Sequence, residues 1–330
     1  MGGGQMKAVV YRRTGPAVDV LEVVELERPE PGPNQVRVRI VTSGINPTDS
    51  ARRAGRAGTG PVEFQVPHHD GAGVVDALGS GVVGLVLGQR VWIYLAAFDN
   101  RYGTAAEYAV VPAERAVPLP DNASDDLGAC LGVPALTAAH CLGGNPEALK
   151  GRTVLVAGGA GAVGHFAIEL AKHAGARVVA TVSSDEKRVL AESAGADLVV
   201  HYTDIDASQR IRDFAGHVDR VVEVAIGANL DLDISVLGVG GTIAVYAVRG
   251  DLTVPAGHLM SANIALKFVL LYGLSSEQLA DAVRWTSDAL GVGALSSLPV
   301  VPYELEQVAE AQDKVEQGTV GKVVLRLAEN

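Results

Sequence analysis

One stretch decides the fold of this chain: Val154-Leu155-Val156-Ala157-Gly158-Gly159-Ala160-Gly161-Ala162-Val163-Gly164. It begins as an apolar run typical of a buried strand, breaks into glycines, and is followed by a helical pattern from Phe166 to Lys172. Gly159, Gly161 and Gly164 have the spacing G-x-G-x-x-G, which allows a tight strand-to-helix turn and close approach of the backbone to a pyrophosphate. The backbone N–H groups that open the helix then face the phosphates.

The sequence around the glycines agrees with this interpretation. A second apolar run, Arg177–Val182, begins after Ala174-Gly175-Ala176, where a glycine suits the end of a helix. Strand, loop, helix and strand together span about thirty residues, the size of one βαβ unit. A chain with 39 glycines can also produce this spacing in a turn that binds nothing. We nevertheless predict dinucleotide binding, by Gly159, Ala160, Gly161, Ala162, Val163 and Gly164.

Length and composition favour a soluble α/β protein of two domains, with 330 residues and 48% hydrophobic content. The net charge of −11 and the lack of a basic run argue against a nucleic-acid partner. No apolar run approaches the ~20 residues of a membrane-spanning helix, so no membrane insertion is expected. Cys130 and Cys141 form neither a disulfide framework nor a zinc-type pair. Inert burial in a reducing cytoplasm is expected for both.

The first part of the chain, from Met6 to about residue 125, is predicted to be β-rich. Short runs of strand character are separated by glycines and prolines, as in a compact antiparallel domain. The runs are Val36–Ile40, Gly73–Gly79, Gly88–Ile93 and Glu107–Val111. The leader Met1–Gln5 is expected to lie outside this fold.

The character of the sequence changes near Ser124, a plausible N-cap for a helix from Asp125 to Leu142. Strands and helices then alternate, which predicts an open, mostly parallel, doubly wound sheet. Its strands are expected at Val154–Ala157, Val178–Val182, Leu198–Val200, Arg220–Val224 and Thr242–Tyr246. We predict three segments: a catalytic domain over 1–124, a dinucleotide-binding domain over 125–263, and a segment over 264–330 that returns to the first domain.

With these features in place, the chain resembles the zinc-free quinone oxidoreductases, the zeta-crystallin branch of the medium-chain dehydrogenase/reductases. The likeness covers essentially residues 6–328. It rests on the glycine loop and on the segments Met6–Tyr11, Gly44–Asp49, Gly132–Ala138 and Gly321–Leu325. The resemblance implies a GroES-like catalytic domain interrupted by a Rossmann domain, which agrees with the α/β organisation above.

The resemblance also bears on metal binding. Zinc relatives in this superfamily bind zinc at positions that correspond here to Asn46, His69 and Val133. A catalytic zinc needs three protein ligands and an open position, and only His69 is of a ligand type. We expect no metal site, and for His69 a structural hydrogen bond or a remnant role, with a substrate-facing role as an alternative.

The cofactor preference is predicted from the end of the second strand of the βαβ unit. An NAD-selective fold places an acidic residue there, whereas this chain has Ser183 and then Asp185 and Glu186, which suit the first turn of the next helix. Ser183 and Lys187 can bind a 2′-phosphate, and the resemblance adds Tyr202. We therefore expect NADPH, with a solvated helix face as the alternative for Lys187.

The resemblance supplies the candidate catalytic residues Asn46, Asp49 and Thr137, and adds Lys322 to the cofactor site. Asn46 is expected to bond the acceptor oxygen or the cofactor, and Thr137 to lie against the nicotinamide. Asp49 is placed as an acid, with a rival role of holding its loop through Arg52 or Arg53. Tyr246, which ends a late strand, is expected near the nicotinamide or in buried packing.

One departure from the family pattern concerns the substrate pocket, since Ala51 stands where many members carry a tyrosine. Tyr94 or Tyr102 could replace that tyrosine. The chain is expected to be a cytoplasmic, homodimeric, NADPH-dependent reductase of quinones, with dimerisation through an edge strand near Ala265–Leu271. An enoyl or alkenal double-bond reductase and a non-catalytic NADPH-binding protein of crystallin type are the alternatives.

Overall fold

The computed structural model describes residues 4–58, 60–61 and 63–327, which form two compact units. Unit 1 combines Met1–Val133 with Pro299–Asn330, and unit 2 is Pro134–Leu298. The predicted α/β architecture, a β-rich domain interrupted by a parallel-sheet domain, is confirmed. Of the predicted leader, Met1–Gly3 lie outside the described residues, while Gln5 already begins the first strand.

Unit 1 is built on a mainly antiparallel sheet with the strand order β14-β15-β3-β4-β5-β7, in which β6 also pairs with β3. The long strand β3 (Gln35–Gly44) bonds to three neighbours and alternates buried and half-buried side chains over residues 38–42. The other strands of this sheet are β4 (Asp70–Leu78), β5 (Arg90–Ile93), β6 (Tyr108–Pro112), β7 (Ala116–Pro118), β14 (Val300–Glu304) and β15 (Lys322–Arg326).

A separate hairpin and several short helices complete unit 1. Strands β1 (Gln5–Val10) and β2 (Glu22–Glu27) pair antiparallel. The helical segments are α1 (Ala17–Val20), α2 (Pro47–Arg53), η1 (Ala113–Arg115), η4 (Leu305–Gln307) and α10 (Val308–Gln317). Helix α3 (Asp125–Cys141) crosses the division between the units and contains Pro134. The Leu127 amide donates to Ser124 Oγ, as expected for the predicted N-cap.

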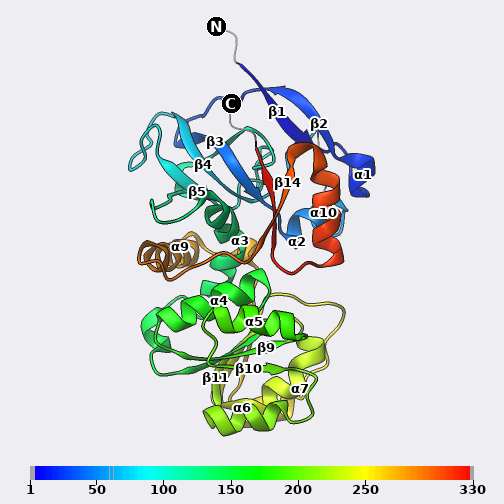
Figure 1. Cartoon of the computed structure of the whole chain (residues 1–330), viewed down its shortest axis with the longest axis vertical. Helices are drawn as coiled ribbons and strands as arrows, with labels where there is room; N and C mark the ends of the chain where they lie inside the picture. The colour runs from blue at the N-terminus through cyan, green and yellow to red at the C-terminus, as the bar shows by residue number, and fades with distance from the viewer. Residues whose placement is uncertain (1–3, 59, 62, 328–330) are drawn as a thin grey trace. The chain divides into compact units, whose positions relative to one another are not determined.

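The last part of the chain returns to unit 1, as predicted, but from Pro299 rather than from residue 264. Strand β15 pairs antiparallel with β3, so red and blue strands lie side by side in Figure 1. Both predicted boundaries, 124/125 and 263/264, differ from the observed 133/134 and 298/299. The second differs because β13 (Ala265–Phe268) adds to the parallel sheet of unit 2, beside β12, through main-chain hydrogen bonds that the sequence pattern does not reveal.

Unit 2 contains a six-stranded parallel sheet with the order β10-β9-β8-β11-β12-β13. Its strands are β8 (Thr153–Ala157), β9 (Arg177–Val182), β10 (Leu198–His201), β11 (Val218–Glu223), β12 (Leu237–Val245) and β13. From β8 the chain adds β9 and β10 on one side and then β11, β12 and β13 on the other, so the strand order reverses between β8 and β11. Ligands of such folds bind at this point. Leu155, Val179, Val221 and Ile243 are fully buried in its core, as expected for strands covered on both faces.

Helices lie on both faces of this sheet, α4 (Ala162–His173) and α5 (Asp185–Ser193) on one, α6 (Ala207–Ala215) and α7 (Ile226–Val236) on the other (Figure 1). The remaining helical segments of unit 2 are η2 (Pro146–Leu149), α8 (Ala256–Ser261), η3 (Leu271–Gly273) and α9 (Ser276–Gly291). Among the described residues, no helix is both long and apolar enough to cross a bilayer.

Candidate functional site

The glycine loop of unit 2 forms the predicted strand-turn-helix at the carboxyl end of β8. Gly158 has φ +68°, a conformation that favours glycine, and its carbonyl accepts from Gly161 N at 2.9 Å. A Cβ on Gly164 would overlap the Gly158 carbonyl, and a Cβ on Gly159 would lie 2.9 Å from Ala180 Cβ. Glycines therefore let the start of α4 pack directly against the sheet.

The amino end of α4 is the anion-binding feature of this loop. Gly161 is the N-cap residue, with φ −81° and ψ 161°, and Ala162, Val163 and Gly164 form the first helical turn. Their N–H groups have no carbonyl four residues earlier within the helix, and the helix dipole adds partial positive charge. Such a terminus binds phosphate without any basic side chain.

At the neighbouring carboxyl end of β9, Lys187 Nζ donates to Ser183 Oγ at 2.9 Å. Ser184 caps α5, and Asp185 and Glu186 lie in its first turn, as predicted. The amide of Tyr202 donates to the Val182 carbonyl, and its side chain is 42% exposed beside the same strand end. A hydroxyl, an ammonium group and an exposed phenol thus lie near one strand end.

Two further predicted residues lie elsewhere in unit 2. Tyr246 directly follows β12, and its amide donates to the Glu223 carbonyl at 3.0 Å. Burial, with Cys141 and Glu223 nearby, raises the pKa of Tyr246. Strands β8 and β11 separate it from β9, which is directly followed by Ser183 of the Ser183–Lys187 pair. Thr137 is buried in α3.

A buried polar network forms the centre of unit 1. Asn46 Nδ2 donates to Asp70 Oδ2 at 2.7 Å, and Lys322 Nζ donates to Asn46 Oδ1 at 2.5 Å. The Val133 amide donates to both oxygens of Asp70, at 2.8 and 3.0 Å. A Cβ on Gly132 would overlap Asp70 Oδ1, so a glycine is required for this approach.

These hydrogen bonds fix the orientation of the Asn46 amide. Lysine only donates and an ionised carboxylate only accepts, so the oxygen faces Lys322 and the nitrogen faces Asp70. Burial raises the pKa of Asp70 to about 6, while Lys322 and the bond from Asn46 oppose that rise. The sequence analysis placed Lys322 in the cofactor site, and here its ammonium group bonds Asn46.

Asp49 lies one turn further along, at the start of α2. Its Oδ2 accepts from the Asn46 amide at 2.7 Å, and its Oδ1 lies 3.9 Å from His69 Nε2. Burial raises the pKa of Asp49 to about 7, and it lowers the pKa of His69 to about 3 with help from Arg52, His68 and Arg115. Asp49 lines a cavity of about 10 Å³, room for one water, together with Tyr11, Arg52 and Gln65.

Of the two arginines suggested as partners that let Asp49 hold its loop, Arg53 makes its hydrogen bonds elsewhere. It donates to Gln312 Oε1 at 3.0 Å, to the Gly15 carbonyl at 2.6 Å and to Glu316 Oε1 at 2.6 Å. These partners come from α10 and from the turn before α1, segments whose approach to α2 depends on the tertiary fold.

The two tyrosines suggested as replacements for the pocket tyrosine have other contacts. Tyr94 is buried and its hydroxyl donates to the Glu114 carbonyl at 3.1 Å, while Tyr102 packs edge-on against Phe64. Tyr11 is the phenol that shares a cavity with Asp49. Cys130 and Cys141 are buried, as predicted, and burial raises the pKa of each thiol to about 12.

The titration of Asp49 gives the first prediction. Its pKa of about 7 lies above the ordinary 3.8, so between these values the unfolded chain releases a proton that the folded protein keeps. Stability contributed by this group is complete below the lower value and is lost as pH rises toward the upper one. Asp49→Asn, which does not titrate, should flatten that part of the stability curve.

Urea unfolding of both proteins across this range of pH measures the difference directly. Asp19→Asn, a substitution on α1 of the same unit, is the matched control and should keep the wild-type slope. Parallel curves for Asp49→Asn and wild type would contradict a raised pKa at this position.

Comparisons with known proteins agree with the two units. Residues 32–121 match the family model of the alcohol dehydrogenase GroES-like domain, and residues 162–288 match that of the zinc-binding dehydrogenases. The chain is 28% identical to quinone oxidoreductase from Rattus norvegicus, over 99% of this chain and 100% of the relative.

Solved structures give the same result. A mycobacterial protein in complex with NADPH superposes with a TM-score of 0.83 at 28% identity, covering 98% of this chain and 100% of that one. An NAD-dependent alcohol dehydrogenase superposes with a TM-score of 0.87 at 30% identity, again over 98% and 100%.

The zinc that such family names imply does not fit the side chains present. Asn46 bonds an ammonium group and a carboxylate, Val133 contributes only its main-chain amide, and His69 is the single side chain of a preferred zinc ligand type among these positions. Among residues 4–58, 60–61 and 63–327, no group of three or more His, Cys, Asp or Glu side chains could hold a metal ion.

The sequence analysis missed Asp70, the acceptor that joins Asn46 to α3. Its signal was weak but present: an acid directly after His69 is followed by the five small or apolar residues 71–75 of a strand, where burial makes an unpaired charge costly. The link from Lys322 to Asn46 had no such signal, because the two residues lie on β15 and before α2, far apart in the sequence.

Proposed function

The chain belongs to the medium-chain dehydrogenase/reductase superfamily, as an oxidoreductase of the quinone oxidoreductase type, and we propose that it transfers hydride from NADPH to a quinone or a quinone-like conjugated acceptor without zinc. The observation that carries this proposal is the buried Lys322–Asn46–Asp70 network, where zinc relatives have a metal ligand. NADPH supplies the hydride when bound, and the protein binds, orients and excludes water.

In unit 2, the first turn of α4 would hold the pyrophosphate through the amides of Ala162, Val163 and Gly164. Ser183 and Lys187, already 2.9 Å apart, would bind the 2′-phosphate, with Tyr202 beside them. NADPH is favoured over NADH because the acidic residue that follows this strand end, Asp185, lies at the start of α5 beside Arg188 and His201. It is therefore not placed to bind the ribose hydroxyls of NADH. Tyr246 and Thr137 would lie toward the nicotinamide.

In unit 1, the second N–H of Asn46 Nδ2 would polarise the acceptor oxygen, since an amide nitrogen carries two N–H donors and Asp70 takes one. Lys322 and Asp70 are positioning residues in this scheme. Asp49 holds the start of α2, directly behind Asn46, through its bond to the Asn46 amide. Because this N–H donor is already oriented before the acceptor binds, it could stabilise the negative charge that develops on the acceptor oxygen without rearrangement of the protein.

The decisive experiment measures NADPH oxidation with a quinone and with a conjugated enone, and NADP reduction with a primary alcohol, before and after dialysis against a chelator. We expect turnover with the quinone that survives chelation. Faster turnover of the enone would assign the protein to double-bond reduction. Alcohol oxidation that chelation abolishes, or NADPH binding without turnover of any acceptor, would contradict the proposal.

Lys187→Ala tests the cofactor preference. We expect NADPH to bind at least about tenfold more weakly with NADH binding unchanged, because a hydrogen bond to a charged group contributes roughly 1.5–3 kcal/mol. Glu186→Ala, its neighbour in the same helical turn, is the control and should leave the ratio of the two dissociation constants as it is. Equal losses for NADPH and NADH would refute a phosphate contact at Lys187.

We also propose that the protein is a cytoplasmic homodimer formed along β13. This strand is an edge of the parallel sheet, and Phe268 and, just after it, Leu270 are 57% and 66% exposed there. An open strand edge with apolar side chains favours pairing with a second copy. Sedimentation equilibrium of Phe268→Glu should give a monomer; a wild-type monomer would overturn this assignment.

A further inference from the structure

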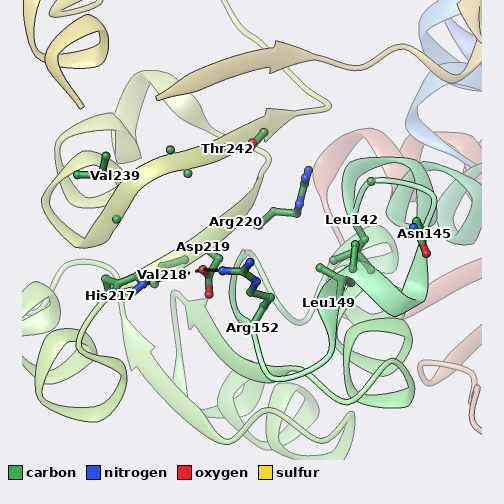
Figure 2. Close-up of a pocket in the computed structure, with 15 residues that line it drawn as sticks. Leu142, Asn145, Leu149, Arg152, His217, Val218, Asp219, Arg220, Val239 and Thr242 are labelled. Atoms are coloured by element: carbon green, nitrogen blue, oxygen red, sulfur yellow. Dashed lines mark hydrogen bonds and ion pairs between the residues drawn. The ribbon is translucent and has the colours of Figure 1, made fainter. Parts of the chain in front are cut away.

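A second cavity lies in unit 2 at the edge of the parallel sheet opposite to the glycine loop (Figure 2). Its volume is about 380 Å³, and its lining includes residues at or directly beside the starts of β8, β11 and β12. Parallel strands all point the same way, so their starts share one edge and their ends, with the glycine loop, share the other. The cavity is therefore separate from the proposed cofactor site.

An interruption in strand pairing creates this cavity. Strands β11 and β12 pair Val218 with Leu237 and then Arg220 with Thr242, so the single residue Asp219 faces the four residues Gly238–Gly241. Gly240 has φ +77°, which only glycine adopts easily. Because three of the four residues Gly238–Gly241 are glycines, this segment presents mainly main-chain groups to the cavity.

Arg220 projects into the middle of the cavity (Figure 2). Within the described residues, its side chain makes one hydrogen bond, from Nη1 to the Cys141 carbonyl, at 3.0 Å. Burial lowers the pKa of Arg220, and the nearby Cys141 opposes that change. A guanidinium has five N–H donors, so a half-buried one with a single carbonyl partner is suited to an anion.

The surroundings of Arg220 add positive charge. Lys267 Nζ lies 2.9 Å from His140 Nε2, and burial, Lys267 and Arg220 together lower the pKa of His140. The carboxylate of the cavity, Asp219, accepts from Arg152 Nη1 at 2.9 Å and from the Thr153 amide at 2.8 Å. The cavity lining therefore contains two arginines and one carboxylate, which is paired with one of them, in a chain whose net charge is −11.

We propose that this cavity binds the phosphate group of a small phosphorylated molecule, with Arg220 as its principal ligand and Arg152 beside it. A planar guanidinium bonds two oxygens of a phosphate at once, and glycine amides can supply further donors. The volume exceeds what inorganic phosphate alone requires, which leaves room for the organic part of the ligand. The site does not depend on the proposed redox activity, since none of its residues takes part in it.

The test is calorimetric titration of the full chain with inorganic phosphate and with pyrophosphate, at low ionic strength so that surface screening stays small. Arg220→Gln, which keeps an amide donor for the Cys141 carbonyl, should weaken binding by about tenfold or more. Asp219→Asn, which removes the competing charge but keeps an acceptor for Thr153, should tighten it. Arg212→Gln, on exposed α6, is the control and should change nothing.

Misfolding would weaken phosphate binding in both variants. Weaker binding by Arg220→Gln together with tighter binding by Asp219→Asn would therefore exclude misfolding as the cause. Binding that is lost in Lys187→Ala but kept in Arg220→Gln belongs to the glycine-loop edge and would overturn the proposal. No binding of either probe by the folded wild-type protein would overturn it as well.

Discussion

Replacing Asp70 by alanine should lower the free energy of unfolding by about 3–5 kcal/mol, the usual cost of removing one partner from a buried charged pair. The substitution leaves the Asn46 amide and the Val133 N–H without their common acceptor in a fully buried site. It also removes the nearby opposite charge from Lys322, which is bonded to Asn46. Chemical denaturation at a pH above about 6, where the carboxylate is ionised, measures the effect.

Two further substitutions separate the charge of Asp70 from its hydrogen bonds. Asp70→Asn keeps one acceptor oxygen and should cost less than alanine. Asp76→Ala, on the same strand, removes a partly exposed partner of Arg37, which keeps Glu30, and should cost only about 1 kcal/mol. A loss at Asp70→Ala no greater than at Asp76→Ala would mean that the network does not stabilise unit 1.

Gly161→Val should weaken NADPH binding by about 100-fold or more, equivalent to roughly 2.8 kcal/mol, while unit 2 stays folded. A side chain at this N-cap position would stand between the pyrophosphate and the amides of α4. Within the protein, its Cβ would meet only the Gly158 carbonyl, at 3.3 Å, so the fold can accommodate it with a small shift.

Gly257→Val, in α8, is the matched control because a Cβ there meets nothing within 4 Å. Fluorescence titration with NADPH, together with melting curves of both variants, separates lost binding from lost folding. Near-normal affinity in a folded Gly161→Val protein would remove the basis for a pyrophosphate site at this loop.

Much of the fold follows from local patterns in the sequence. The apolar run before Gly158 and the helical pattern after it specify β8 and α4, since buried parallel strands and amphipathic helices leave distinct periodicities. An edge strand near Ala265–Leu271 was expected, but it was assigned to the segment after residue 263 rather than to the parallel-sheet domain. Its place in that sheet depends on pairing with β12, and its residues are half-exposed to exposed. The domain boundary at 264 was misplaced for the same reason.

By itself, the sequence determined the glycine turn, the helix cap at Ser124, the acidic first turn of α5, and the burial of both cysteines, because each depends on residues close together in the chain. Only the tertiary structure decided the partners of Asn46, which are contributed by β4 and β15, and the exposure of Arg220 to a cavity. Hydrogen bonds between distant segments depend on how backbones approach one another, and no periodicity in the sequence records that approach.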